Sequence, residues 1–202
     1  SLRAFDDLIR QGKVLYIGFS EWNASQISNA IEIQNRLSLD KFVSSQPQYS
    51  MLWRVIESEV IPVCEKNGIG QIVWSPMAQG VLSGKYLPGK KIPAGSRASD
   101  KKGGAEMISR WMRDDVLTAV QKIKPIADEV GLTMGQFALA WALQNTNVSS
   151  VIMGATKPSQ VKENVKASGV KLSTEVMKAV EDALGNIAEK DPEKTVSPNP
   201  RA

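Results

Sequence analysis

The residues of this chain best suited to chemistry lie between positions 68 and 86, in the stretch GIGQIVWSPMAQGVLSGKY. The apolar run at 69–73 predicts a buried strand. Trp74 ends this run and is followed at once by Ser75 and Pro76, so an aromatic ring stands beside a turn with free backbone N–H groups. Such a site suits a flat ring joined to phosphates. A core strand ending in an ordinary turn would have the same local sequence, so the prediction depends on matching residues elsewhere.

Composition limits the chemistry that the chain can perform alone. It contains 25 basic and 21 acidic residues, a net charge of +4 that is spread along the sequence and gives little support to a nucleic-acid surface. Histidine is absent, which removes the commonest general acid/base and the commonest metal ligand. We therefore expect no metal site.

The length of 202 residues with 42% hydrophobic content predicts a single globular domain. No run approaches the roughly 18 apolar residues of a membrane span, so we expect a soluble, cytoplasmic protein without a membrane partner. The single cysteine, Cys64, excludes an internal disulfide and is compatible with a reducing compartment. Its apolar helical neighbours predict a small buried hydrophobic residue.

Short apolar strands alternate with amphipathic helices along the chain. This order predicts a parallel sheet with helices outside it. In the helix before the first strand, Leu2, Phe5, Leu8 and Ile9 share one face. The predicted strands are residues 14–20, 42–46, 69–75 and 149–155. Later helices are predicted from a cap at Ser25, near 60–67, at 114–130 and 134–145, from Pro158, and at 173–184, with Gly131 ending the helix at 114–130 and Thr133 capping the next one.

Two segments interrupt this alternation. The connection from residue 76 to about 113, rich in Gly, Lys, Ser and Pro, exceeds the usual loop length, which indicates either a functional excursion or a disordered surface insert. The end of the chain, residues 191–202, is polar and proline-rich and is predicted to be a mobile tail. The domain is therefore expected to cover residues 1–190.

Polar or small residues follow each predicted strand. In parallel α/β folds, ligands gather beyond the carboxyl ends of the strands. Convergence of four strand ends is stronger evidence for a site than one loop. The residues at these ends are Ser20 and Glu21, Gln46, Trp74 and Ser75, and Gly154 and Thr156.

Four motifs, YIGFSEW, QPQYS, IVWSPMAQGVLSGKY and VIMGATKPSQVKEN, occur in this order over nearly the whole chain. Together they resemble the aldo-keto reductases, especially bacterial members near the potassium-channel β-subunit branch. The resemblance implies an α/β fold, a TIM (β/α)8 barrel of which this chain covers about the second half, strands 5 to 8. It also implies reduction of aldehydes and ketones with NADP(H). The absence of a G-x-G-x-x-G motif agrees with a cofactor site that is not of the Rossmann type.

The resemblance assigns cofactor-binding roles to the strand-end residues. Ser20 and Gln46 would hydrogen-bond the nicotinamide carboxamide, and Trp74 would stack on the nicotinamide ring. Lys85 and Arg97 would be cations near the phosphates, although solvated loop charges are an equal reading of the residues alone. The pyrophosphate would be lined by Ser75, Pro76, Met77, Ala78, Gln79 and Gly80.

The last motif would hold the adenosine end of the cofactor. The residues implied are Gly154, Thr156, Gln160, Glu163 and Asn164, and the last three share one helical face by their spacing. Many relatives have an arginine at the position of Gln160, where it pairs with the 2′-phosphate. NADP(H) is therefore favoured and NAD(H) is not excluded. Glu21 also replaces the common Asn or Arg, and the sequence assigns it no role.

The Asp, Tyr, Lys and His tetrad of the family belongs to motifs that this chain does not contain, so no catalytic residue is assigned here. A half barrel would leave unpaired edges and an open apolar interior. Three explanations remain: a longer protein, two halves that pair, or a missing half that is not represented, and we favour an incomplete representation. The expected partners are a carbonyl substrate and the N-terminal half, in the same or another chain, and a homo-oligomer is compatible.

Two other functions remain open. One is a nucleotide-sensing regulatory subunit with little turnover, and the other is a degenerate half barrel without a ligand. The substrate cannot be read from the residues, although Trp53 and Trp111 would contribute to specificity if they reach the pocket.

Overall fold

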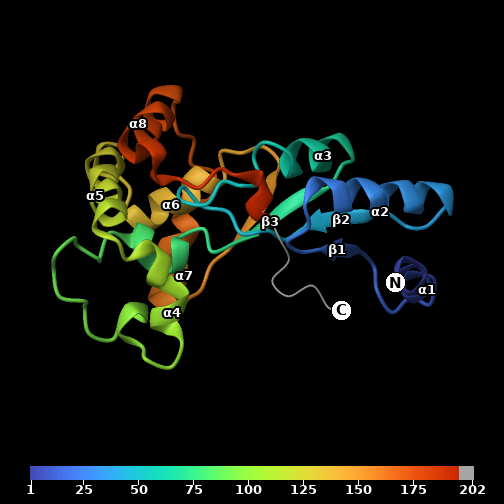
Figure 1. Ribbon diagram of the computed structural model, residues 1–202, viewed down its shortest axis with the longest axis horizontal. Helices are drawn as coiled ribbons and strands as arrows, with labels where there is room; N and C mark the ends of the chain where they lie inside the picture. The colour runs from blue at the N-terminus through green and yellow to red at the C-terminus, as the bar shows by residue number, and fades with distance from the viewer. Residues whose placement is uncertain (196–202) are drawn as a thin grey trace.

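The computed structural model describes residues 1–195 and contains one sheet of four parallel strands in chain order, β1 to β4 (Figure 1). The strands are β1 Ile17–Phe19, β2 Phe42–Ser45, β3 Gly70–Trp74 and β4 Val148–Ile152. All four lie within or next to the predicted segments, so the parallel α/β sheet is confirmed. Each strand pairs with the next one along the chain, as expected for successive βα units.

Eight α-helices accompany the strands in the described part of the chain. They are α1 Leu2–Arg10, α2 Ala24–Arg36, α3 Val60–Lys66, α4 Gly104–Ile108, α5 Asp114–Glu129, α6 Met134–Ala142, α7 Pro158–Asn164 and α8 Thr174–Leu184. Figure 1 shows α2 and α3 together on one side of the sheet, and α5, α6 and α8 in a separate group beyond β3.

Local capping explains several helix boundaries. Gly131 has a φ of 71° just after α5, and Thr133 caps α6 by accepting the backbone N–H of Gln136, as predicted. For α2 the prediction was wrong by two residues, because Asn23 rather than Ser25 is the cap. The Asn23 side chain accepts the N–H of Gln26, whose own side chain accepts the N–H of Asn23.

The helix-covered face of the sheet is packed with aromatic residues. The rings of Phe19 and Trp22 stack with their centroids 4.9 Å apart, and the edge of Phe42 completes the group. Cys64 on α3 is fully buried, which confirms its prediction as a small core residue, and burial raises the pKa of its thiol.

The opposite face of the sheet carries small residues and exposed apolar ones. Gly18, Ser44 and Gly70 lie next to one another across β1, β2 and β3. A Cβ atom on Gly18 would lie 2.4 Å from Ser44 Oγ, so the close approach of these strands requires glycine there. Ile152, paired with Trp74 on this same face, remains 43% exposed. This face is therefore not covered by the described residues.

Helix α1 differs from its prediction. Its only buried residue is Asp6, whereas Phe5 of the predicted apolar face is 39% exposed. Asp6 accepts the N–H of Asp40 at 2.9 Å and the Nε–H of Arg10 at 2.7 Å. A buried carboxylate with two donors thus attaches this helix to the loop before β2, while Leu2 and Ile9 of the predicted apolar face pack against the core.

The long connection after β3 is folded. It contains α4 and the 3-10 turns Ala78–Ser83, Arg97–Ser99 and Ser109–Trp111, and it buries Tyr86, Ile108 and Trp111. The disordered-insert alternative is therefore wrong for this segment. The sequence did not predict α4.

The C-terminal segment packs against the loop that follows β2. The N–H of Arg54 donates to the carbonyl of Glu189 at 2.7 Å, and the N–H of Glu189 donates to that of Leu52 at 3.0 Å. Residues 192–194 form a 3-10 turn, and Thr195 is 1% exposed. The rest of the predicted tail, residues 196–202, lies outside the described residues. Within residues 1–195, no helix has the length and apolar character needed to cross a bilayer.

Candidate functional site

The ends of β1 and β2 bring two predicted cofactor residues together. Ser20 Oγ donates a hydrogen bond to the backbone carbonyl of Gln46 at 2.7 Å, and the N–H of Gln46 donates to the carbonyl of Phe19 at 2.8 Å. Both Ser20 and Gln46 are exposed. One hydroxyl and one amide side chain are therefore available next to each other at this end of the sheet.

Trp74, at the end of β3, is held through both its backbone and its ring. Its N–H donates to the carbonyl of Pro47 at 3.0 Å, and its carbonyl accepts the N–H of Tyr49 at 3.2 Å. The indole Nε1–H donates to Glu21 Oε1 at 2.8 Å, and the same oxygen accepts the N–H of Gln48 at 2.6 Å. The half-buried ring thus has a fixed orientation.

The loop after Trp74 has an unusual backbone. Ser75, Ala78 and Gln79 have φ angles of 53°, 45° and 55°, and Gly80 has 101°. With Glu21, at 55°, four of the five non-glycine residues with positive φ in residues 1–195 lie at these strand ends. Left-handed backbone at non-glycine residues costs energy and is concentrated at functional sites. Such turns also expose successive N–H groups, which form anion-binding hollows.

Lys85 lies beside this loop. A Cβ atom placed on Gly80 would be 3.5 Å from Lys85 Nζ, an ordinary van der Waals distance, so the ammonium group lies against Gly80. Arg97, the other predicted cation, is exposed at the start of a 3-10 turn, and no hydrogen bond or ion pair joins its side chain to another described residue. The structure brings Lys85, but not Arg97, to the predicted phosphate loop.

The fourth group of predicted residues lies on α7 and the turn before it. No residue of α7 is buried. The side-chain oxygen of Gln160 accepts the N–H groups of Thr156 at 2.7 Å and Lys157 at 3.1 Å, so this residue caps its own helix. Glu163 pairs with Lys166 at 2.9 Å.

Asn164, at the end of α7, donates to the sulfur of Met153 at 3.1 Å. Gly154 is exposed on the turn between β4 and α7. Thr156 and Gln160 are thus in direct contact, while Glu163 and Asn164 contact other neighbours.

Three further residues, Gln48, Arg110 and Trp111, complete the site, and the sequence assigned none of them to the cofactor. Arg110 Nη2 donates to Gln48 Oε1 at 2.9 Å, and its guanidinium lies 4.3 Å and 4.5 Å from the ring centroids of Trp53 and Trp111. Trp111 Nε1 donates to Gln79 at 3.0 Å. Gln48 stood in a quoted motif, but nothing in the sequence of the long connection marks Arg110.

These contacts close a ring of interactions around the strand ends. Gln79 Nε2 donates to Ser75 Oγ at 3.0 Å, and Ser75 directly follows Trp74. The ring therefore passes from Trp74 through Glu21, Gln48, Arg110, Trp111 and Gln79 to Ser75. Burial raises the pKa of the Glu21 carboxyl, while its hydrogen bonds from Gln48 and Trp74 oppose that shift. Burial also lowers the pKa of Arg110.

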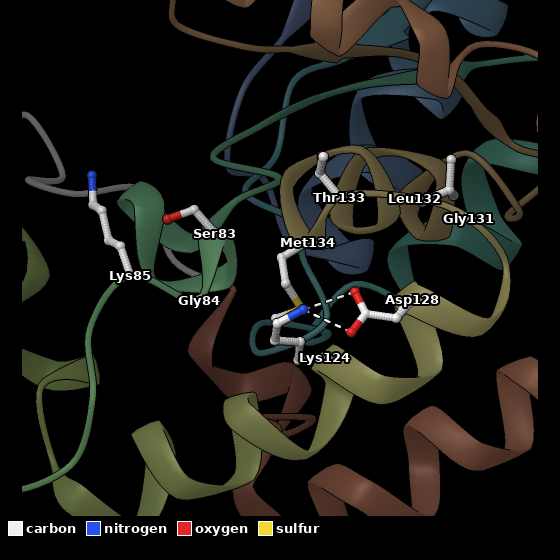
Figure 2. Close-up of a pocket in the computed structure, with 9 residues that line it drawn as sticks. All are labelled: Ser83, Gly84, Lys85, Lys124, Asp128, Gly131, Leu132, Thr133 and Met134. Atoms are coloured by element: carbon white, nitrogen blue, oxygen red, sulfur yellow. Dashed lines mark hydrogen bonds and ion pairs between the residues drawn. The ribbon is translucent and has the colours of Figure 1, made fainter.

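An open hollow of about 550 Å³ lies between α5, α6 and the turn at residues 83–85. Figure 2 shows its ion pair, in which Lys124 Nζ lies 2.7 Å from Asp128 Oδ2, with Lys85 pointing away from the pair. Among the residues lining this hollow, only Lys85 was predicted for the site. The hollow therefore meets the predicted site at Lys85.

Comparisons with known proteins agree with the motifs. The model of the Aldo/keto reductase family matches residues 1–184. The chain is 45% identical over 171 residues to a probable voltage-gated potassium channel subunit beta of Arabidopsis thaliana, covering 84% of this chain and 52% of the relative. It is 41% identical over 200 residues to a protein of the same description in Oryza sativa subsp. japonica, covering 98% and 59%.

A third relative, a putative voltage-gated potassium channel subunit beta of Schizosaccharomyces pombe, is 41% identical over 187 residues, with 91% of this chain and 54% of the relative covered. The chain thus spans little more than half the length of these three curated relatives. The family resemblance deduced from the motifs is confirmed.

Proposed function

Because the chain belongs to the aldo/keto reductase family, we propose that it forms the cofactor-binding part of a cytoplasmic NADP(H)-dependent oxidoreductase that reduces aldehydes and ketones to alcohols. The observation that carries the proposal is the convergence of an oriented indole, Trp74, with the polar ends of two neighbouring strands. When bound, the cofactor supplies the hydride. The residues of this chain bind and orient it.

The residues present fit such a cofactor. The Trp74 N–H is already bonded to Glu21, so the ring is held by its edge and its face is left for stacking on nicotinamide. Ser20 and Gln46 offer the hydroxyl and amide groups that a carboxamide requires. The left-handed turn at residues 75–80, with Lys85 beside it, suits a pyrophosphate.

We propose that the preference for NADP(H) over NAD(H) depends on a weak contact between Gln160 and the 2′-phosphate. Gln160 is neutral, and its oxygen already caps α7, which leaves its amide N–H groups for a 2′-phosphate. A neutral amide discriminates less than a guanidinium. We therefore expect NADP(H) to be favoured by a modest factor.

We also propose that the four strands are strands 5 to 8 of a (β/α)8 barrel. The open face with Ile152 would then contact the N-terminal half, in the same or another chain. The carbonyl substrate would bind between the two halves, and proton transfer would be performed by residues of that N-terminal half.

Titration with NADPH tests the proposal. We expect quenching of tryptophan fluorescence and a higher melting temperature in the complete polypeptide, because a ligand bound only by the folded state stabilises it. Trp74→Leu should abolish most of the quenching, whereas Trp22→Leu, in the aromatic group under α2, serves as the matched control. Absence of both quenching and thermal protection in the unchanged protein would contradict the proposal.

The second candidate function is nucleotide sensing by a regulatory subunit, because the three relatives are described as potassium channel β subunits. Both functions require the cofactor site, so binding alone does not separate them. A panel of aldehydes and ketones tested for NADPH oxidation does. Turnover supports the reductase, whereas tight NADPH binding without turnover supports the sensing subunit.

A further inference from the structure

We propose that Glu21 is the positioning residue that sets the plane of Trp74, and through it the place of the nicotinamide ring. This inference rests on the proposed cofactor site. It gives a role to a residue for which the sequence offered none. Glu21 would act through Trp74 rather than by touching the reacting atoms.

The first support is the geometry around one carboxylate oxygen. Glu21 Oε1 accepts the indole N–H of Trp74 at 2.8 Å and the backbone N–H of Gln48 at 2.6 Å. These donors come from the ends of β3 and β2, and Glu21 itself follows β1. One oxygen therefore joins three strand ends, and bonds to a charged acceptor are stronger than neutral ones.

The second support is the backbone of Glu21. Its φ of 55° is costly for a residue with a long side chain, and Asn or Gly would adopt it at lower cost. Asn, however, is one methylene shorter and would not reach the indole. The costly backbone conformation of Glu21 therefore occurs together with a side chain long enough to reach the Trp74 indole.

The third support is the ring of contacts beyond Gln48. Arg110 bonds the Gln48 side chain, Trp111 bonds Gln79, and Gln79 bonds Ser75. This ring of contacts reaches Trp74 at two points, through Glu21 after β1 and through Ser75 in the phosphate loop. Trp74 is therefore restrained from both sides. Loss of Glu21 would open this ring at the indole itself.

Two variants of the complete polypeptide distinguish a role of Glu21 in positioning Trp74 from a general role in folding. Glu21→Gln keeps an oxygen that accepts both N–H groups, whereas Glu21→Asn keeps a residue suited to positive φ but removes the reach. With Glu21→Asn, we expect the NADPH dissociation constant to rise about tenfold, the order expected for one charged hydrogen bond. With Glu21→Gln, which keeps the acceptor oxygen but loses the charge, the rise should be smaller, about threefold.

Binding of a cofactor fragment and an NMR spectrum give two results that a general folding defect would not produce. Binding of 2′,5′-ADP, which lacks the nicotinamide, should be unchanged in both variants. The indole ¹⁵N–¹H resonance of Trp74, assigned by its loss in Trp74→Phe, should shift strongly in Glu21→Asn and less in Glu21→Gln, where an amide oxygen replaces the carboxylate as acceptor.

Two results would overturn the inference: an unchanged indole resonance in Glu21→Asn, or equal weakening of NADPH and 2′,5′-ADP. If the unchanged protein binds no NADPH, the proposed function fails. The indole resonance, measured without cofactor, then still decides whether Glu21 holds Trp74.

Discussion

At the scale of single residues, the contact between Lys85 and the loop at Gly80 is the most direct link between sequence and ligand chemistry. The ammonium group of Lys85 lies 3.5 Å from the point where a Cβ atom of Gly80 would stand. An exposed lysine alone would say little, because most lysines are exposed. Its position beside a left-handed turn makes it a phosphate contact in our proposal.

Lys85→Met should therefore weaken NADPH binding by about tenfold at low salt, because a charged contact to phosphate is lost. The difference from the unchanged protein should shrink as salt is added, because screening weakens that contact. The dissociation constant measured at two salt concentrations checks this.

Lys124→Met is the matched control, since the Lys124 ammonium group is paired with Asp128 within α5 (Figure 2). It should leave NADPH affinity unchanged. Equal effects of the two substitutions would show that Lys85 acts only through overall charge.

At the scale of elements, α1 depends on a buried carboxylate. The N–H of Asp40 and the Arg10 guanidinium hold the pKa of Asp6 below its usual value. Because the folded pKa is lowered, this contribution to stability is present above the unfolded pKa and is lost as pH falls through the folded pKa.

Asp6→Asn should lower the free energy of unfolding at pH 7, and the difference from the unchanged protein should shrink as the pH is lowered below about 4. Urea unfolding at several pH values measures this. The neighbouring, exposed Asp7 provides the control substitution, Asp7→Asn, with little effect expected. A deficit for Asp6→Asn that does not change with pH would contradict the assignment.

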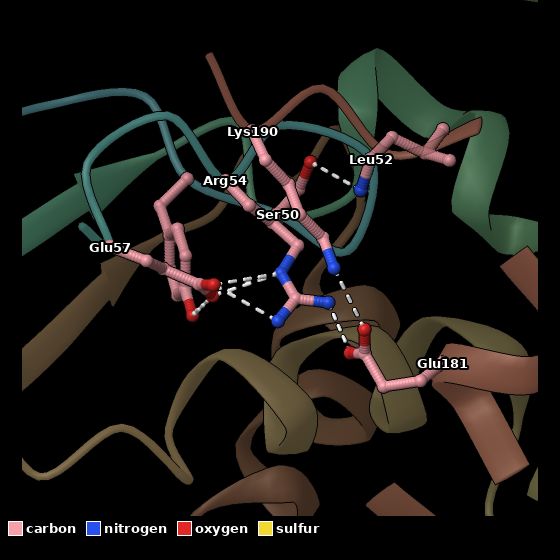
Figure 3. Close-up of polar contacts among 7 residues, drawn as sticks. Ser50, Leu52, Arg54, Glu57, Glu181 and Lys190 are labelled. Carbon is pink, nitrogen blue, oxygen red and sulfur yellow. Dashed lines mark hydrogen bonds and ion pairs between the residues drawn. The ribbon is translucent and has the colours of Figure 1, made fainter. Parts of the chain in front are cut away.

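A second element-scale link joins the loop after β2 to α8 (Figure 3). Arg54 bonds Glu57 at 2.9 Å and also Glu181, while Lys190 bonds Glu181 at 3.0 Å. The Arg54 side chain is 12% exposed, so its partners would keep partly buried charges without it.

Arg54→Met should cost about 2 kcal/mol and lower the melting temperature by about 4–8 °C. Lys178→Met, which removes the exposed pair with Asp182 on the same helix, should cost less than about 0.5 kcal/mol. Thermal unfolding of both variants provides the test. Comparable losses of stability in the two variants would mean that the burial of Arg54 and its partners adds nothing to the stability of the fold.

Local sequence patterns predicted the helices and strands well but predicted the contacts between them poorly. Alternation of apolar runs and helix periods located all four strands, and Gly131 and Thr133 correctly marked the boundary between α5 and α6. The anchoring of α1 by Asp6 was missed because its partner, Asp40, lies 34 residues away. A pattern of period 3.6 describes only neighbours on one helix.

The same limit applies to the site. Trp74, Ser20 and Gln46 could be placed together from the sequence because each stands at the end of a predicted strand. Arg110 was not, since its partner Gln48 is 62 residues away and no periodicity marks the long connection. The role of Glu21 likewise required the position of Trp74, which only the folded sheet supplies.

At the scale of the whole molecule, the uncovered face of the sheet distinguishes the chain alone from a complete barrel. Ile152→Lys should change the stability of the 202-residue chain little, because the side chain is already 43% exposed. In a complete barrel the same substitution buries a charge and should be strongly destabilising. Urea unfolding of both forms compares them, and equal effects would contradict the proposed barrel interior.

The order of the strands also has a consequence for synthesis. Since β1, β2 and β3 pair in sequence, they can assemble as soon as they leave the ribosome, but β4 begins only at Val148, after the whole connection that follows Trp74. At ribosomal rates this is a delay of roughly 4–15 s. During that interval the edge of β3 has no strand beside it, so the nascent chain is most exposed to chaperones and to misassembly there.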